Sequence, residues 1–246
     1  TTAPGSTQKT TPDYSPASFT PSSPDVSSQK TPPVLAATQS NNTISVNTDV
    51  FNVKIDLNTG NLVQSSMKKY PESTELNSVP VEILNGNNEQ LFVGQSGVTN
   101  ADFSTPFRAS QKVYQLQPGQ NTLLVTLSNT TEKGLAITKT YTFTRSQYDI
   151  QLNQSVKNQG QQPWRGGFYQ QISRRDVPST TRQVRSFNGA SISSPHQPYK
   201  KITYKDLSKE AINQTISQGW IAMQQPYFLA AWIPSTTEPL HYFSHV

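Results

Sequence analysis

Apolar residues recur with a period of two in two neighbouring segments, 135–143 and 150–156, which are separated by the polar run Arg145-Ser146-Gln147. Successive side chains of a β-strand point to opposite faces, so a period of two indicates a strand with one buried face. The positions that alternate with these apolar residues are rich in Thr and Gln, as on the outer face of an antiparallel pair. The apolar positions are Leu135, Ile137, Tyr141, Phe143, Ile150, Leu152 and Val156.

The same period recurs along the chain and predicts an all-β fold. Residues 50–57 alternate in this way, and the turn Asn58-Thr59-Gly60-Asn61 follows, where Gly60 can take a positive φ. Leu207–Ile216 is the best helix candidate, with Asp206 as its N-cap, although a loop fits it nearly as well. Many strands and frequent turns favour a sandwich or barrel. Shorter strands are predicted at 80–84, 91–95, 112–117, 121–128, 168–174, 200–206 and 219–233.

Residues 1–42 differ from the rest in composition. They contain seven prolines and sixteen Ser or Thr residues, with almost no apolar periodicity. Such a segment buries too little apolar surface to offset the entropy of ordering it. We therefore expect a disordered linker over 1–42 and a folded domain that begins near Thr43.

Several classes of site are excluded or disfavoured. The chain has no cysteine, so disulfides and thiolate chemistry are absent. His241 and His245 have a chelating i, i+4 spacing but lack the HExxH pattern, and no catalytic triad is recognisable. We therefore expect no catalytic residues, no metal site, no cofactor and no enzyme activity. No stretch of about 18 apolar residues occurs, and the chain lacks an initial Met, so it is expected to be a piece of a longer protein.

Two segments resemble the periplasmic domain of Gram-negative YidC-type membrane protein insertases. Residues 219–234 read GWIAMQQPYFLAAWIP, similar to the family stretch GGW(V/I)AMxQxYFxxAWIP, with departures at Gln218 and Pro226. Residues 44–50 and the turn at 58–61 resemble the family's opening strand and its TxGG turn, with Asn61 at the second Gly. Residues 186–190 and 199–201 also resemble a family segment, so the likeness covers 43–246.

The resemblance implies a twisted β-supersandwich similar to galactose-mutarotase-like domains. It implies a protein of the inner membrane with this domain facing the periplasm, preceded by a linker that follows a membrane span. The full protein would assist insertion and folding of inner-membrane proteins through a membrane region that lies outside this chain. This domain would be an accessory docking scaffold for Sec translocon components (SecD/SecF). Because the family domain continues further, the chain is expected to stop before the domain is complete.

A basic segment, residues 165–205, holds eight basic residues against the single acidic residue Asp176. Such a cluster can meet anionic lipid headgroups or an acidic partner surface, whereas the alternative is a set of solvated charges on several faces. Aromatic residues are not interleaved for base stacking, so nucleic-acid binding is disfavoured. The basic residues are Arg165, Arg174, Arg175, Arg182, Arg185, Lys200, Lys201 and Lys205.

The three tryptophans bear on a second function, that of a carbohydrate- or peptide-binding β-sandwich module. Trp220 and Trp232 lie in the most apolar stretch and are predicted to be core residues. Trp164 lies in a turn-rich loop and is the candidate exposed aromatic of a cleft. A cleft lined by aromatic and carboxamide side chains would favour this second function, whereas a basic surface without convergent polar groups would favour scaffolding.

Overall fold

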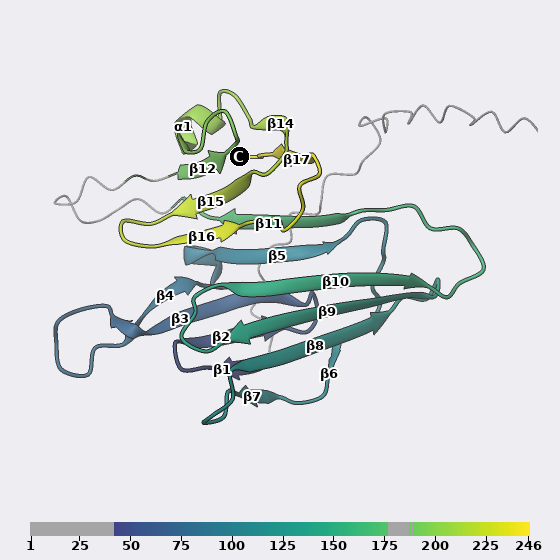
Figure 1. Cartoon of the computed structure of the whole chain (residues 1–246), viewed down its shortest axis with the longest axis horizontal. Helices are drawn as coiled ribbons and strands as arrows, with labels where there is room; N and C mark the ends of the chain where they lie inside the picture. The colour runs from purple at the N-terminus through teal and green to yellow at the C-terminus, as the bar shows by residue number, and fades with distance from the viewer. Residues whose placement is uncertain (1–41, 177–186, 188) are drawn as a thin grey trace, which may run out of the picture. The chain divides into compact units, whose positions relative to one another are not determined.

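A computed structural model describes residues 42–176, 187 and 189–246 (Figure 1). The chain divides into two compact units, 1–31 and 32–246, and the described residues belong to the second. The predicted linker over 1–42 therefore falls outside the described residues, except for Asn42. Within the described ranges, no helix has the length and apolar character needed to cross a membrane.

The largest sheet has seven strands in the order β11-β5-β3-β2-β1-β7, with β4 also paired to β3. All its pairs are antiparallel except β1 with β7. A register shift between Lys54 and Ile55 marks an irregularity in the β2–β3 pair. The strands are β1 (Thr43–Asn47), β2 (Phe51–Asp56), β3 (Asn61–Pro71), β4 (Pro80–Leu84), β5 (Phe92–Val98), β7 (Val113–Gln115) and β11 (Phe168–Arg174); the 3-10 turn η2 (Asn88–Gln90) precedes β5.

The second sheet contains the two segments with the strongest alternation. Its four strands run in the order β10-β9-β8-β6, and β9 pairs with β10 from Leu135 opposite Asn158 to Phe143 opposite Ile150. This confirms the antiparallel pair predicted from the period of two. The strands are β6 (Arg108–Ala109), β8 (Thr122–Thr130), β9 (Leu135–Thr144) and β10 (Ile150–Asn158).

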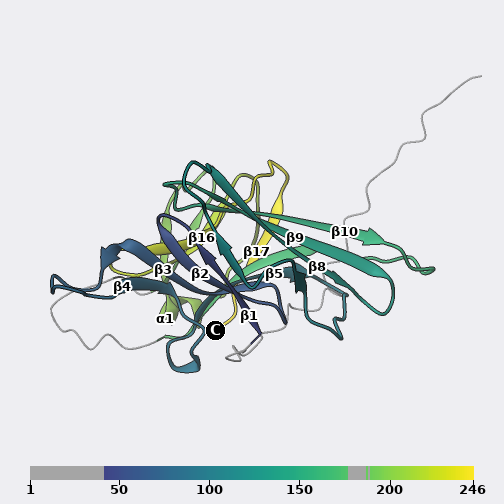
Figure 2. The ribbon, with the colours of Figure 1, turned by 90° about the horizontal axis from the view of Figure 1, so that it is seen from below.

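The two sheets pack face to face over one hydrophobic core (Figure 2). Val46 and Ile55 from the first sheet and Val125 and Leu127 from the second are all fully buried. Buried and more exposed residues alternate along β8 and β9, so each of these strands contributes every second side chain to the core. Burial of such side chains is the main stabilising contribution in a sandwich of this kind, at roughly 1.5–3 kcal/mol each. The fold is thus the predicted all-β sandwich.

The C-terminal part adds two small sheets. One has the order β13-β12-β15-β16, and the other pairs β14 with β17 around a separate core of Ile192, Ile216 and Tyr242. The helix α1 (Tyr204–Leu207) follows β13 directly. The strands are β12 (Gly189–Ser193), β13 (Lys200–Thr203), β14 (Asn213–Ile216), β15 (Trp220–Gln224), β16 (Leu229–Trp232) and β17 (Leu240–Phe243).

The helix interpretation of residues 207–216 was wrong. The helix expected over 207–216 ends at Leu207, because Thr203 and not Asp206 is the N-cap: its hydroxyl accepts from the Asp206 N–H at 3.2 Å. Residues 213–216 pair with β17 as a strand instead. The strand content predicted for 219–233 is confirmed: β15 and β16 pair as a hairpin, and Pro226, which cannot donate to a ladder, falls between them.

Candidate functional site

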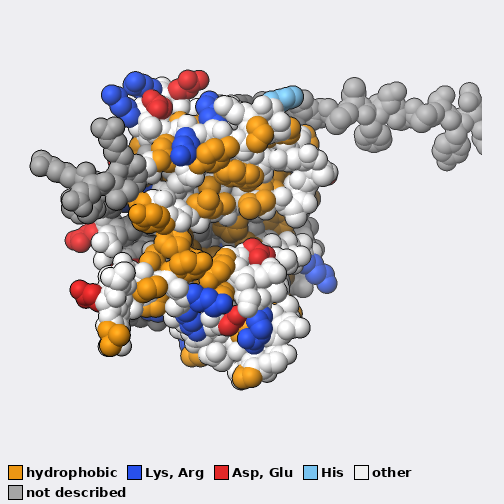
Figure 3. Space-filling view, turned by 60° about the vertical axis from the view of Figure 1, so that its left-hand side comes forward, with side chains coloured by type: hydrophobic (Ala, Val, Ile, Leu, Met, Phe, Trp, Pro, Cys, Tyr) orange, Lys and Arg blue, Asp and Glu red, His pale blue; other side chains and the backbone are white. Residues whose placement is uncertain are grey.

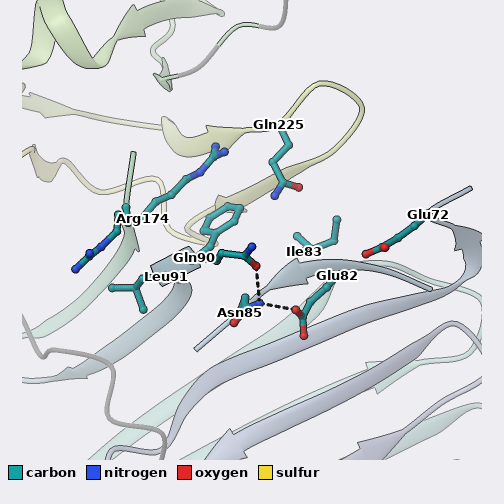
Figure 4. A pocket seen from close by; sticks show the side chains of 10 residues that line it. Glu72, Glu82, Ile83, Asn85, Gln90, Leu91, Arg174 and Gln225 are labelled. Carbon is teal, nitrogen blue, oxygen red and sulfur yellow. Dashed lines mark hydrogen bonds between the residues drawn. The ribbon is translucent and has the colours of Figure 1, made fainter. Parts of the chain in front are cut away.

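A polar pocket of about 240 Å³ lies where β4, β5 and β11 meet the turn between β15 and β16 (Figure 4). Arg174 lies on one wall and the carboxylates of Glu72 and Glu82 on the opposite one. Charges of both signs and several carboxamides therefore face one small space. The lining residues are Glu72, Glu82, Ile83, Asn85, Gln90, Leu91, Phe92, Arg174, Arg175 and Gln225.

The side chain of Arg174 is fixed in place by two contacts. Its guanidinium donates to the backbone carbonyl of Gln224 on β15 and lies 5.0 Å from the ring centre of Phe92. A guanidinium over an aromatic face is attracted by the ring quadrupole. Arg174 therefore ties the end of β11 to β15 while it keeps a positive charge at the pocket wall.

Glu82 is held from both sides by carboxamides. Gln64 donates to one carboxylate oxygen, and Asn85 donates to the other at 2.6 Å. Asn85 also reaches the side-chain oxygen of Gln90 at 3.4 Å (Figure 4). This network positions the acidic wall for recognition of a polar group. Among the described residues, no three His, Cys, Asp or Glu side chains gather as a metal site would require.

The structure separates the predicted basic residues into two groups. Arg165 precedes β11, and Arg174 ends it, so about 20 Å of strand lies between them. Lys200 and Lys201 lie on β13, and Lys205 lies on α1. Arg182 and Arg185 fall outside the described residues.

Gln224 links two members of the second group, Arg174 and Lys201. The carbonyl of Gln224 accepts from Arg174, and its side chain donates to the hydroxyl of Tyr199. Lys201 lies 5.7 Å from the Tyr199 ring centre and 5.2 Å from that of Phe187. We name Arg174, Arg175, Lys200, Lys201 and Lys205 the basic end. Sequence alone does not reveal this grouping, because Gln224 is distant from all five in the chain.

Trp164 packs into the structure and does not line the pocket. It is half-buried, and its indole N–H donates to the carbonyl of Asn100 at 3.1 Å. A Cβ on Gly166 would lie 2.2 Å from the Trp164 ring, so the close approach requires glycine. Trp164 therefore anchors the loop before β11. Trp220 and Trp232 are also half-buried, and Trp232 donates to the carbonyl of Gln171 on β11 at 2.9 Å.

Lys139 is a polar residue of the core that the sequence analysis missed. It occupies the apolar row of β9 and is only 1 % exposed. Its ammonium donates to the carbonyls of Ser96 at 2.7 Å, Thr59 at 3.1 Å and Gly60 at 3.2 Å. Burial lowers the pKa of Lys139 from its ordinary 10.5 to about 7. The signal in the sequence was a lysine at a position where the alternation requires an apolar residue.

Comparison with known proteins shows the family to which the chain belongs. The sequence profile of the family described as the YidC periplasmic domain matches residues 43–246. "Membrane protein insertase YidC" of Coxiella burnetii (strain Dugway 5J108-111) is 43% identical over 240 residues, covering 95% of this chain and 42% of that protein. The protein of the same name from Legionella pneumophila (strain Corby) is 37% identical, covering 78% of this chain and 36% of that protein.

A third relative gives the same result. "Membrane protein insertase YidC" of Marinobacter nauticus is 36% identical over 203 residues, covering 78% of this chain and 36% of that protein. The chain thus spans less than half the length of these relatives. The match over 43–246 and the high identity agree with the motifs at 44–61 and 219–234, and the chain belongs to the YidC periplasmic domain family.

Proposed function

We propose that this domain is an accessory docking scaffold of a membrane protein insertase. The protein that contains it would assist insertion and folding of inner-membrane proteins, and a membrane region outside this chain would contact the substrates. Membership of a periplasmic family and the names of the relatives support this proposal. The domain would hold a partner, a Sec component such as SecD/SecF or an anionic lipid surface, and would carry out no chemistry itself.

The basic end is the observation that carries the proposal. Arg175, Lys200, Lys201 and Lys205 are exposed, and they come from a strand end, a second strand and a helix that the fold brings together. Positive charges grouped on one surface attract acidic partners and anionic headgroups, at about 1 kcal/mol for each charge near a membrane. The aromatic rings of Tyr199 and Phe187 beside Lys201 add apolar contact area.

Charge reversal at the basic end tests the proposal. We expect the triple variant Arg175→Glu, Lys200→Glu, Lys205→Glu to bind phosphatidylglycerol vesicles or a SecD/SecF periplasmic fragment at least about tenfold more weakly. The wild-type affinity should fall as salt rises, because exposed charges are screened beyond about 10 Å at 0.1 M ionic strength. Vesicle co-sedimentation and fluorescence anisotropy would measure the two interactions.

The matched control reverses three exposed lysines elsewhere on the domain that make no ion pair among the described residues, Lys54→Glu, Lys69→Glu and Lys112→Glu. It makes the same change in net charge as the test variant, so the two triple variants differ only in where on the surface the charges are reversed. The proposal fails if the control loses as much affinity as the test variant. It also fails if the wild type shows no salt-sensitive binding to either surface.

The pocket favours a second candidate function, binding of a carbohydrate or peptide. Three carboxamides, Asn85, Gln90 and Gln225, line it together with Phe92, which is the kind of lining that polar ligands require. We expect a ligand of this kind to raise the melting temperature of the wild type and not of Glu72→Ala, which removes an exposed carboxylate from the wall. A panel of oligosaccharides and short peptides in thermal-shift assays would test it. A panel without any stabilising compound would exclude this candidate.

A further inference from the structure

The strand β10 leaves one edge of its sheet open. It is the terminal strand in the order β10-β9-β8-β6 and pairs only with β9. Its nine residues form a ladder without a register shift and contain no proline. Every second residue of such an edge directs its N–H and C=O away from the sheet. Within the described ranges, no backbone hydrogen bond outside the β9 pairing involves residues 150–158.

The core-facing side chains of β10 are incompletely covered. In β9 the apolar residues of this row are at most 3 % exposed, whereas Ile150, Leu152 and Val156 of β10 are only half-buried. Gln154 lies in the same row, and its side-chain oxygen is buried without a hydrogen-bond partner among the described residues. A buried acceptor without a donor costs about 1–3 kcal/mol. An added fifth strand would cover the half-buried row of Ile150, Leu152 and Val156.

The two ends of this edge differ in character. At the start of β10, Tyr148 makes edge-on contacts with Phe51 and Tyr70, and Tyr70 contacts Phe228 in the same way. Tyr227, which precedes Phe228 in the chain, is 81 % exposed. The side of the domain that carries the start of β10 and the β15–β16 turn shows gathered apolar side chains (Figure 3). The other end of β10 carries an exposed lysine, Lys157.

We propose that the free edge of β10 binds an extended polypeptide segment, which joins the sheet as a fifth strand. The segment has apolar residues at alternate positions, which continue the row of Ile150, Leu152 and Val156. It carries an aromatic or large apolar residue at the end beside Tyr148 and an acidic residue at the end beside Lys157. Backbone hydrogen bonds supply the affinity, and the row and the two ends supply the selectivity.

A second copy of this chain is the competing occupant of the edge. Two β10 strands related by a two-fold axis run antiparallel, so residue 148 of one copy lies near residue 158 of the other. The aromatic end then faces the polar, lysine-bearing end in both copies. Lys157 of each copy would then approach Tyr148 and Asp149 of the other, so the oligomeric state in solution has to be measured beside peptide binding.

Binding of a designed peptide tests the proposal. The probe is a fluorescein-labelled peptide of about ten residues with alternating Val and Thr, a Tyr at one end and two Glu at the other, made in both sequence directions. We expect one direction to bind and to slow amide hydrogen exchange in β10. The same peptide with alternate backbone amides N-methylated should bind at least about tenfold more weakly, since each lost hydrogen bond removes part of the affinity.

Matched variants separate this edge from the basic end. Lys157→Glu should weaken binding of the acidic-ended probe several-fold, roughly as expected for reversal of one exposed charge, whereas Lys54→Glu should leave it unchanged. The triple reversal of Arg175, Lys200 and Lys205 should also leave binding of the probe unchanged. Failure of the docking proposal for the basic end would therefore not affect the proposal for the β10 edge.

Three results would overturn the inference. One is equal affinity for the N-methylated and unmodified probes, since backbone pairing would then not be the source of binding. Another is absence of binding by either direction up to about 1 mM, which corresponds to only about −4 kcal/mol. The third is a dimer in sedimentation equilibrium that the probe does not dissociate, because a second copy would then occupy the edge.

Discussion

Replacement of Lys139 by methionine is expected to abolish a rise in stability of about 2 kcal/mol that the wild type shows between pH 7 and pH 9. Methionine keeps most of the apolar stem of the side chain and removes the ammonium. The effect is large because burial in the core disfavours the charged ammonium, and its hydrogen-bond partners, oxygens of Ser96, Thr59, Gly60 and Asn61, carry no full negative charge that would compensate.

The direction follows from proton linkage. In the folded domain the pKa of Lys139 is about 7, whereas in the unfolded chain it returns to about 10.5. Between these values the unfolded chain binds more protons than the folded one, so the free energy of unfolding increases with pH. The contribution is complete above the unfolded pKa and is lost as the pH falls toward 7. Below pH 7 both states are protonated and the slope from this residue disappears.

Urea unfolding at pH 7, 8 and 9 would measure the effect, with Lys54→Met as the control. Lys54 is exposed on β2, so its replacement should leave the wild-type slope intact. Retention of the full slope in Lys139→Met would show that another group titrates with folding. The variant should also leave the carbonyl of Thr59 without its recorded side-chain donor, which adds a cost that does not depend on pH.

The parts of the fold that the sequence predicts well are those where local pattern and burial agree. The β9–β10 pair is predicted because the period of two continues over both segments and the loop between them is short. The region 207–216 is different, because a few apolar residues spaced by four or five positions fit several structures. There a capping threonine and the pairing of β14 with β17 decide the outcome, and that pairing joins residues that are distant in sequence.

The candidate site shows where prediction from sequence ends. The basic residues of 165–205 were identified by composition, but only the fold separates Arg165 from Arg174. The acidic wall comes from Glu72 and Glu82, which belong to a different part of the chain from Arg174 and Gln225. A single sequence contains no signal that would pair these residues across strands. Lys139 is the exception, since a charged residue in an apolar row is visible in the sequence.

Trp232 is expected to hold the C-terminal sheet against the main sandwich, and Trp232→Ala should destabilise the domain by about 3 kcal/mol. Its indole donates to the carbonyl of Gln171 on β11, and its ring lies 3.7 Å from the position of a Cβ on Gly94 of β5. Trp232 therefore contacts two strands of the seven-stranded sheet. For a domain of this size the loss corresponds to a fall in melting temperature of roughly 6–12 °C.

Two further variants test why Trp232 matters. One separates the packing of its ring from its hydrogen bond, and the other asks whether any tryptophan of the small sheet has the same effect. Trp232→Phe keeps an aromatic ring and loses the N–H donor, so it should cost only about 1 kcal/mol. Trp220→Ala removes a half-buried tryptophan of the same small sheet, whose ring lies tilted at 6.1 Å from that of Tyr199. It should cost less than Trp232→Ala because Trp220 makes no side-chain hydrogen bond to β11 among the described residues.

Hydrogen exchange would show which part of the domain depends on Trp232. In Trp232→Ala, amides of β12, β15 and β16 should exchange faster while those of β8 and β9 stay protected, because the small sheet then opens without unfolding the sandwich. The carbonyl that fixes Arg174 belongs to Gln224 on β15, so this opening should also loosen the basic end and weaken its binding to anionic vesicles. Equal acceleration of exchange in β9 and β15 would show instead that the sheets unfold as one cooperative unit. Trp232 would then stabilise the whole domain and not specifically the attachment of the small sheet.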